Sequence, residues 1–221
     1  MVKLRMLCPS RGRPDNIVEL RRVWDQFTAD AELLVAVDDD DPRASEYGSN
    51  VRVLSGPRGL GPIINKLAVE IAPTCDAIGF LGDDHRPRTP SWDERLLAVL
   101  HGQIGVTYGN DLHQGGNLPT AVVMSSAIVR TLGYMVPPGV EHLYHDDFWR
   151  RLGEDLGCLE YLPGIIIEHC HPVAGKAVWD DGYERANSVN QYARDKTAFD
   201  RFLAERWPGD LERLRASLVA A

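Results

Sequence analysis

The first half of the chain alternates short apolar segments with longer segments of helical periodicity. The apolar segments lie within residues 2–8, 31–42, 51–54, 76–85, 104–110 and 121–125. Between the first two, residues 16–27 place large apolar side chains at helical spacing, and a further helix is expected at residues 91–102. Strands that are apolar at nearly every position are typical of a parallel sheet covered on both faces. We therefore expect an α/β fold with a mainly parallel central sheet flanked by helices.

The second half is less regular. Helices are expected at residues 126–133, 145–157, 190–207 and 210–220, and one or two strands within residues 158–172. The last two helices carry apolar stripes, which favour packing against the sheet, with a homodimer as the alternative. No linker separates the halves. We expect a single domain spanning residues 1–221, with residues 1–110 and 111–221 as two functional halves.

Composition limits the function. The chain of 221 residues has a net charge of −8, which opposes non-specific binding to nucleic acid or to anionic membranes. Its four cysteines are widely spaced without a CxxC pair, which favours reduced thiols and a cytoplasmic location. No apolar run approaches the ~20 residues that span a bilayer, so no membrane insertion is expected.

Polar side chains gather where the predicted strands end. The four segments are PSRGRP (9–14), DDDDP (38–42), GDDHRP (82–87) and EHCHP (168–172). Ligands bind at the carboxyl ends of strands in open α/β sheets. Asp83 and Asp84 follow a buried strand, and paired carboxylates suit Mg²⁺ or Mn²⁺. The alternative is that this pair forms a turn and a helix cap.

Histidine and further carboxylates extend this pattern. His169 and His171 are two residues apart in an extended segment, so both imidazoles point to one side. One of them could complete a metal site, and His171 is preferred. Asp147, or else Asp146, opens a predicted helix and could remove a proton from an acceptor hydroxyl. Both carboxylates could instead serve only as partners of the helix dipole.

Basic residues accompany the strand ends. Arg11 and Arg13 lie in a loop after the first strand, where a guanidinium can bind phosphate oxygens with two parallel hydrogen bonds. Arg58 precedes a glycine-rich helix start, although no Walker motif follows. Lys176 could close over a diphosphate. Each of them could also be a solvated surface side chain.

The motifs CPSRGRP, VAVDDDDP, RGLGPIINK, FLGDDH, HDDFW and EHCHP, in this order, resemble the GT-A fold glycosyltransferases. The resemblance is to family-2-like enzymes and to small phage-encoded relatives, and covers about residues 3–175. It departs from the family pattern in two places: the metal motif reads GDD rather than a spaced D-x-D, and the acceptor-side ED motif reads DD.

The resemblance implies a role for each matching residue. Pro9, Ser10 and Arg11 would line the nucleotide pocket, and Asp38 or Asp39 would contact the base. Asn65 and Lys66 would lie near the ribose or phosphates. Asp83 would lie near the ribose, Asp84 closest to the ion, and His171 would be a third metal ligand. Asp147 would match the acceptor-side carboxylate.

The sequence thus favours metal-dependent transfer of a sugar from a nucleotide-sugar, preferably a UDP-sugar, to a hydroxyl with Mn²⁺ or Mg²⁺. Inversion at the sugar is preferred over retention. The acceptor could be a modified DNA base, a protein, a glycan or a lipid-linked sugar. The alternatives are a sugar-phosphate nucleotidyltransferase, a metal-dependent phosphoesterase and a non-catalytic sugar-nucleotide binding module. If the chain is phage-encoded, its location would be the host cytoplasm.

Overall fold

A computed structural model describes residues 3–56, 58–100 and 104–219. Its strands are β1 (Leu4–Pro9), β2 (Glu32–Asp38), β3 (Arg52–Leu54), β4 (Ala77–Phe80), β5 (His85–Pro87), β6 (Val106–Asn110), β7 (Val122–Ser125) and β8 (Leu159–His169). Its α-helices are α1 (Pro14–Phe27), α2 (Leu60–Ile71), α3 (Trp92–Leu100), α4 (Ser126–Leu132), α5 (His145–Leu156), α6 (Asp181–Ala186), α7 (Val189–Glu205) and α8 (Trp207–Val219). Short 3₁₀ helices are η1 (Ala44–Tyr47), η2 (Ala72–Thr74), η3 (Gly115–Asn117) and η4 (Pro172–Ala174).

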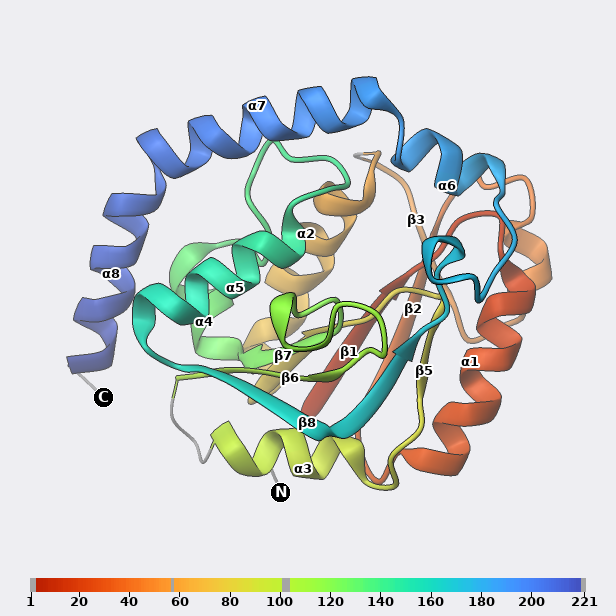
Figure 1. Cartoon of the computed structure of the whole chain (residues 1–221), viewed down its shortest axis with the longest axis horizontal. Helices are drawn as coiled ribbons and strands as arrows, with labels where there is room; N and C mark the ends of the chain where they lie inside the picture. Colours follow the sequence, from red (N-terminus) through yellow and green to blue (C-terminus); the bar gives the residue numbers. More distant parts are fainter. Residues whose placement is uncertain (1–2, 57, 101–103, 220–221) are drawn as a thin grey trace.

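The strands form one sheet in the order β3-β2-β1-β4-β7-β6-β8-β5 (Figure 1). β1 pairs in parallel with β2 and β4, and β6 pairs in parallel with β8. Among the strands of the described residues, β7 and β5 alone run against this direction. The expected α/β fold with a mainly parallel sheet is therefore confirmed.

Helices cover both faces of the sheet, and an apolar core lies under each. α1 and α3 pack on one face, where Ile17 and Leu96 are fully buried. α2, α4 and α5 cover the other face, and α7 and α8 pack outside these helices (Figure 1). β1 shows the consequence for sequence, because Met6 faces the first core and the next residue, Leu7, faces the second. This is why the strand is apolar at successive positions.

The sequence analysis placed most elements within a few residues. The predicted strand at 76–85 is in fact two strands, because the chain turns at residues 82–84 between β4 and β5. The short helix α6 was not predicted. Val2, His101, Gly102 and Ala220, which the predictions assigned to a strand and two helices, lie outside the described residues. Among the described helices, none combines the length and apolar character needed to cross a membrane.

Two features of β8 bring distant residues to one place. Its first half pairs with β6, and the partner of β6 jumps from Leu162 to Ile166 at Asn110, which marks a bulge. The second half then pairs antiparallel with β5, with His169 opposite His85. The carboxyl end of β8 therefore lies beside the turn that follows β4.

Candidate functional site

A cavity of about 600 Å³ lies at the carboxyl ends of β1, β2 and β4. Eleven of the residues singled out in the sequence line it: Pro9, Ser10, Arg11, Arg13, Asp38, Arg58, Asp83, Asp84, Asp146, His169 and His171. The polar strand ends therefore converge on one site. Asp39, Asn65, Lys66, Asp147 and Lys176 do not belong to its lining.

Asp83 is a buried carboxylate held by residues from the loop after β1 and from α1. The hydroxyl of Ser10 donates to Asp83 Oδ2 over 2.6 Å, and the side-chain amide of Asn16 donates to Oδ1 over 3.4 Å. The Arg13 guanidinium lies 3.5 Å from Oδ1. Burial, together with the neighbouring charge of Asp84, raises the pKa of Asp83 to about 6. These contacts fix the side chain within the wall of the cavity.

Asp84 lies between two histidines that the β5–β8 pairing brings together. The imidazoles of His85 and His169 stack with ring centres 4.1 Å apart. Asp84 Oδ1 is 3.3 Å from His85 Nδ1, and Asp84 Oδ2 is 3.3 Å from His169 Nε2. Burial alone would raise the pKa of Asp84, but hydrogen bonding and charge from the two histidines outweigh burial and hold this pKa well below its usual range.

This cluster suits a divalent transition-metal ion. Asp84, His85 and His169 can each offer one ligand atom, and these atoms all lie within 4.8 Å of one another. Neighbouring ligands of an ion at ~2.1 Å stand about 3 Å apart, close to the separations found here. His169 Nδ1 is buried without a hydrogen-bond partner among the described residues. One carboxylate and two imidazoles suit Mn²⁺ better than Mg²⁺, which prefers oxygen alone.

His171, the preferred third ligand in the sequence analysis, lies on the cavity wall but outside this cluster. Its Nδ1 accepts a hydrogen bond from the backbone N–H of Val173 over 3.2 Å. Its ring makes an edge contact with that of His169, with centres 5.1 Å apart. Burial, with the nearby His169, lowers the pKa of His171 to about 4, so the ring is neutral at pH 7. Its role as a ligand stays a prediction.

The helix α6 covers the acidic pair. The hydroxyl of Tyr183 donates to Asp84 Oδ2 over 2.8 Å. The guanidinium of Arg13 lies over the Tyr183 ring, 3.7 Å from its centre, and donates to both carboxylate oxygens of Asp180 over 2.8 and 2.7 Å. A single arginine thus connects the loop after β1, the acidic pair and α6.

The opposite end of the cavity combines arginines with carboxylates after β2. Asp38 is buried, and its Oδ2 is 3.1 Å from Arg11. Arg58 lies 3.8 Å from Asp38 and 2.8 Å from both Asp39 and Asp40. Asp39 is therefore an exposed partner of Arg58 next to the cavity. This end offers both hydrogen-bond acceptors and positive charge.

The first turn of α5 distinguishes the two candidate bases. Asp146 lines the cavity, whereas Asp147 does not. The Asp146 side chain accepts a hydrogen bond from the backbone N–H of Asp147 over 3.0 Å. Burial, with the charge of Asp147, raises the pKa of Asp146 to about 6. Of the two candidate carboxylates, Asp146, the second choice from the sequence, is therefore the one on the cavity wall.

Three side chains that were predicted to contact the donor make contacts outside the cavity instead. The side chain of Asn65 bonds the backbone of Met135 and Val136, which joins α2 to the loop before α5. Lys66 donates to the carbonyl of Ser55 over 2.8 Å on the surface. Lys176 pairs with Glu168 at 2.9 Å. The structure does not bring these three side chains to the cavity.

The structure adds residues that the sequence analysis did not select. His85 directly follows the acidic pair, and this adjacency was the signal that could have found it. Tyr183 reaches Asp84 from far along the chain, and nothing in its surrounding sequence indicates the contact. His142 and Arg185 also line the cavity.

Comparison with known proteins identifies the fold. No protein-family model matches the chain, and no curated protein matches it. A Pyrobaculum calidifontis mannosyltransferase solved with GDP-Man and Mn²⁺ matches with a TM-score of 0.62 and 12% identity, over 99% of this chain and 74% of the other. Glucosyl-3-phosphoglycerate synthase from Mycobacterium tuberculosis, solved with Mn²⁺, UDP-glucose and phosphoglyceric acid, matches with a TM-score of 0.57 and 15% identity, over 89% and 79%. Staphylococcus aureus TarS 1–349, solved with UDP, matches with a TM-score of 0.55 and 11% identity, over 93% and 73%. The chain therefore has the fold of these nucleotide-sugar transferases.

Proposed function

We propose that the chain transfers a sugar from a nucleotide-sugar to an acceptor hydroxyl and requires a divalent cation. The observation that carries this proposal is the single cavity that joins Asp84, His85 and His169 to the arginines and the buried Asp38. The structural neighbours are solved with UDP, UDP-glucose or GDP-Man, and two of them with Mn²⁺. The fold and the chemistry of the cavity agree.

The donor would occupy the cavity from β2 to β4. Asp38 can accept a hydrogen bond from an N–H group of the base, as the uracil ring of a UDP-sugar offers. Arg11 and Arg13 lie on the path towards the acidic pair, where guanidinium groups stabilise phosphate oxygens. Asp84, His85 and His169 would hold the cation, which would offset the negative charge of the departing diphosphate.

Asp146 is the proposed general base. Its carboxylate lies on the cavity wall, and its pKa of about 6 leaves it ionised at pH 7 while it can still accept a proton. In an inverting transfer, Asp146 would take the proton of the acceptor hydroxyl as the sugar leaves the diphosphate. We prefer inversion because Asp146 places a carboxylate that can accept a proton on the cavity wall.

A donor panel tests the proposal. Purified protein is incubated with UDP- and GDP-sugars and Mn²⁺, and release of the nucleoside diphosphate is measured with and without EDTA. We expect turnover of at least one donor, loss of turnover with EDTA, and loss in Asp84→Ala. Asp25→Ala, an exposed position on α1, is the matched control and should behave as wild type. Absence of both binding and turnover across the panel would defeat the proposal.

A further inference from the structure

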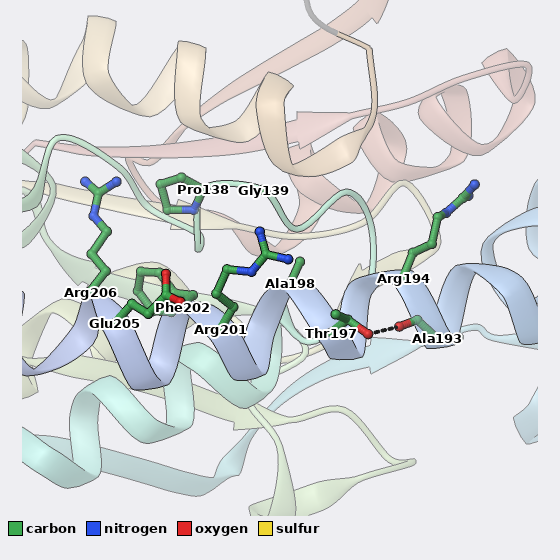
Figure 2. Close-up of a pocket in the computed structure, with 10 residues that line it drawn as sticks. All are labelled: Pro138, Gly139, Ala193, Arg194, Thr197, Ala198, Arg201, Phe202, Glu205 and Arg206. Atoms are coloured by element: carbon green, nitrogen blue, oxygen red, sulfur yellow. Dashed lines mark hydrogen bonds between the residues drawn. The ribbon is translucent and has the colours of Figure 1, made fainter.

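A second cavity, of about 650 Å³, lies between α7 and the loop at Pro138 and Gly139 (Figure 2). Figure 2 shows Arg194 and Arg201 rising from this side of α7, and Arg206 directly after the end of the helix. Between them the helix presents the small side chains of Ala193, Thr197 and Ala198, which leave the space open. We call this cavity, with its ten lining residues in Figure 2, the α7 groove.

The α7 groove is positively charged in a chain whose net charge is −8. Its walls carry three arginines and one acid, Glu205. Arg194 bonds Gln191 within the helix and stays 3.9 Å from Glu141, while Arg206 pairs with Asp210 at 3.0 Å. The side chain of Arg201 makes no hydrogen bond or ion pair with any residue that the structure describes. Its guanidinium can take an anion without breaking an existing pair.

The α7 groove adjoins the candidate active site. Arg194 lines both cavities, and Gln191, one turn earlier on α7, lines the first. Arg194 and Arg201 are seven residues apart, about 10 Å along the helix axis. A ligand that reaches from the active-site cavity into the groove would therefore pass Arg194 and meet Arg201.

We propose that the α7 groove binds a phosphate group of the acceptor, with Arg201 as its main contact. The identification of the ligand as the acceptor rests on the proposed function, whereas the phosphate site itself is argued from the geometry of the groove. A planar guanidinium binds phosphate oxygens through two parallel hydrogen bonds, which a single ammonium group does not reproduce. The phosphate would anchor the acceptor while its hydroxyl reaches Asp146.

The test measures binding and does not depend on sugar transfer. Amide resonances of the whole chain are followed during a titration with inorganic phosphate, and separately with glycerol 2-phosphate and glycerol. We expect saturable shifts in α7 residues 193–206 with both phosphates and none with glycerol. Arg201→Gln should weaken this binding about tenfold, the loss expected for a hydrogen bond to a charged group. Arg201→Lys should lie between the two.

Lys196→Gln is the matched control. It removes one positive charge from the same helix, but Lys196 pairs with Asp200 outside the groove. It should leave phosphate binding at the wild-type level. An equal loss of binding in both variants, or shifts confined to Arg11, Arg13 and Arg58 of the active-site cavity, would overturn the proposal. The proposal would also be overturned if a single-stranded oligonucleotide bound the groove far more tightly than glycerol 2-phosphate and did so with steep salt dependence. The phosphate would then belong to a nucleic acid. If no donor in the panel is bound or turned over but phosphate still binds the groove, the proposed transferase activity is refuted and the phosphate site is not.

Discussion

Asp195 on α7 holds the loop that leads into the active-site helix α5, and its replacement should be costly. The side chain is 1% exposed. Its carboxylate accepts hydrogen bonds from the backbone N–H groups of Glu141, His142 and Leu143 over 2.9, 3.0 and 2.8 Å, and from Gln191 over 2.9 Å. Asp195→Ala removes all four bonds at once.

The magnitude follows from these contacts. A hydrogen bond to a charged acceptor contributes about 1.5–3 kcal/mol. The four bonds share one group, so their contributions do not add, and Glu141 and His142 are exposed residues whose N–H groups can bond water after the change. We expect Asp195→Ala to lower the free energy of unfolding by about 2–4 kcal/mol.

The assay is urea denaturation followed by tryptophan fluorescence. Asp200→Ala is the control, because Asp200 lies on the same helix but is exposed and pairs only with Lys196, so it should change stability by less than about 0.5 kcal/mol. Burial would raise the pKa of Asp195, but its hydrogen bonds outweigh burial and lower that pKa. The stabilisation should therefore be complete above the ordinary pKa of 3.8 and disappear as pH falls through the lower folded value. A loss below 1 kcal/mol at pH 7, or one equal to that of the control, would refute the reasoning.

Two further predictions concern the candidate active site. Tyr183→Phe removes the hydrogen bond that orients Asp84. We expect the Mn²⁺ affinity measured by titration calorimetry to fall about tenfold, as for other groups that orient metal ligands. Tighter binding would mean that the phenol competes with the ion for Asp84. The pKa of Asp146 is raised to about 6, so kcat/KM should fall about tenfold per pH unit below pH 6, a range in which Asp83 also titrates. A raised carboxyl pKa means that ionisation of Asp146 costs stability above pH 6, so Asp146→Asn should lose activity at pH 7 without losing stability. A kcat/KM that stays constant from pH 5 to 8 would exclude Asp146 as the base.

Sequence predicted the sheet because the physical cause is local. A strand buried on both faces must be apolar at successive positions, and Met6, Leu7 and Cys8 show this directly. The same reasoning located the polar ends that line the cavity. The turn at residues 82–84 was only the alternative interpretation of the Asp83–Asp84 pair, because apolar or buried residues continue on both sides of it.

The details of the site depended on tertiary pairing. Asp146 and Asp147 have the same chemistry, and only the packing of α5 decides which of them faces the cavity. His85 becomes a candidate ligand because β8 pairs with β5 and places His169 opposite it. Asn65, expected near the donor, instead joins α2 to the loop before α5. Such choices depend on contacts between residues distant in sequence, which periodicity does not encode.

The pairing of β5 with β8 has a thermodynamic consequence. Because backbone hydrogen bonds already set His85 opposite His169, little conformational entropy remains to be lost when an ion arrives. An ion that binds the folded state alone would act as a removable cross-link between two remote parts of the chain, and the melting temperature should rise with its concentration. Ion binding and folding would then be thermodynamically linked, because each would favour the other.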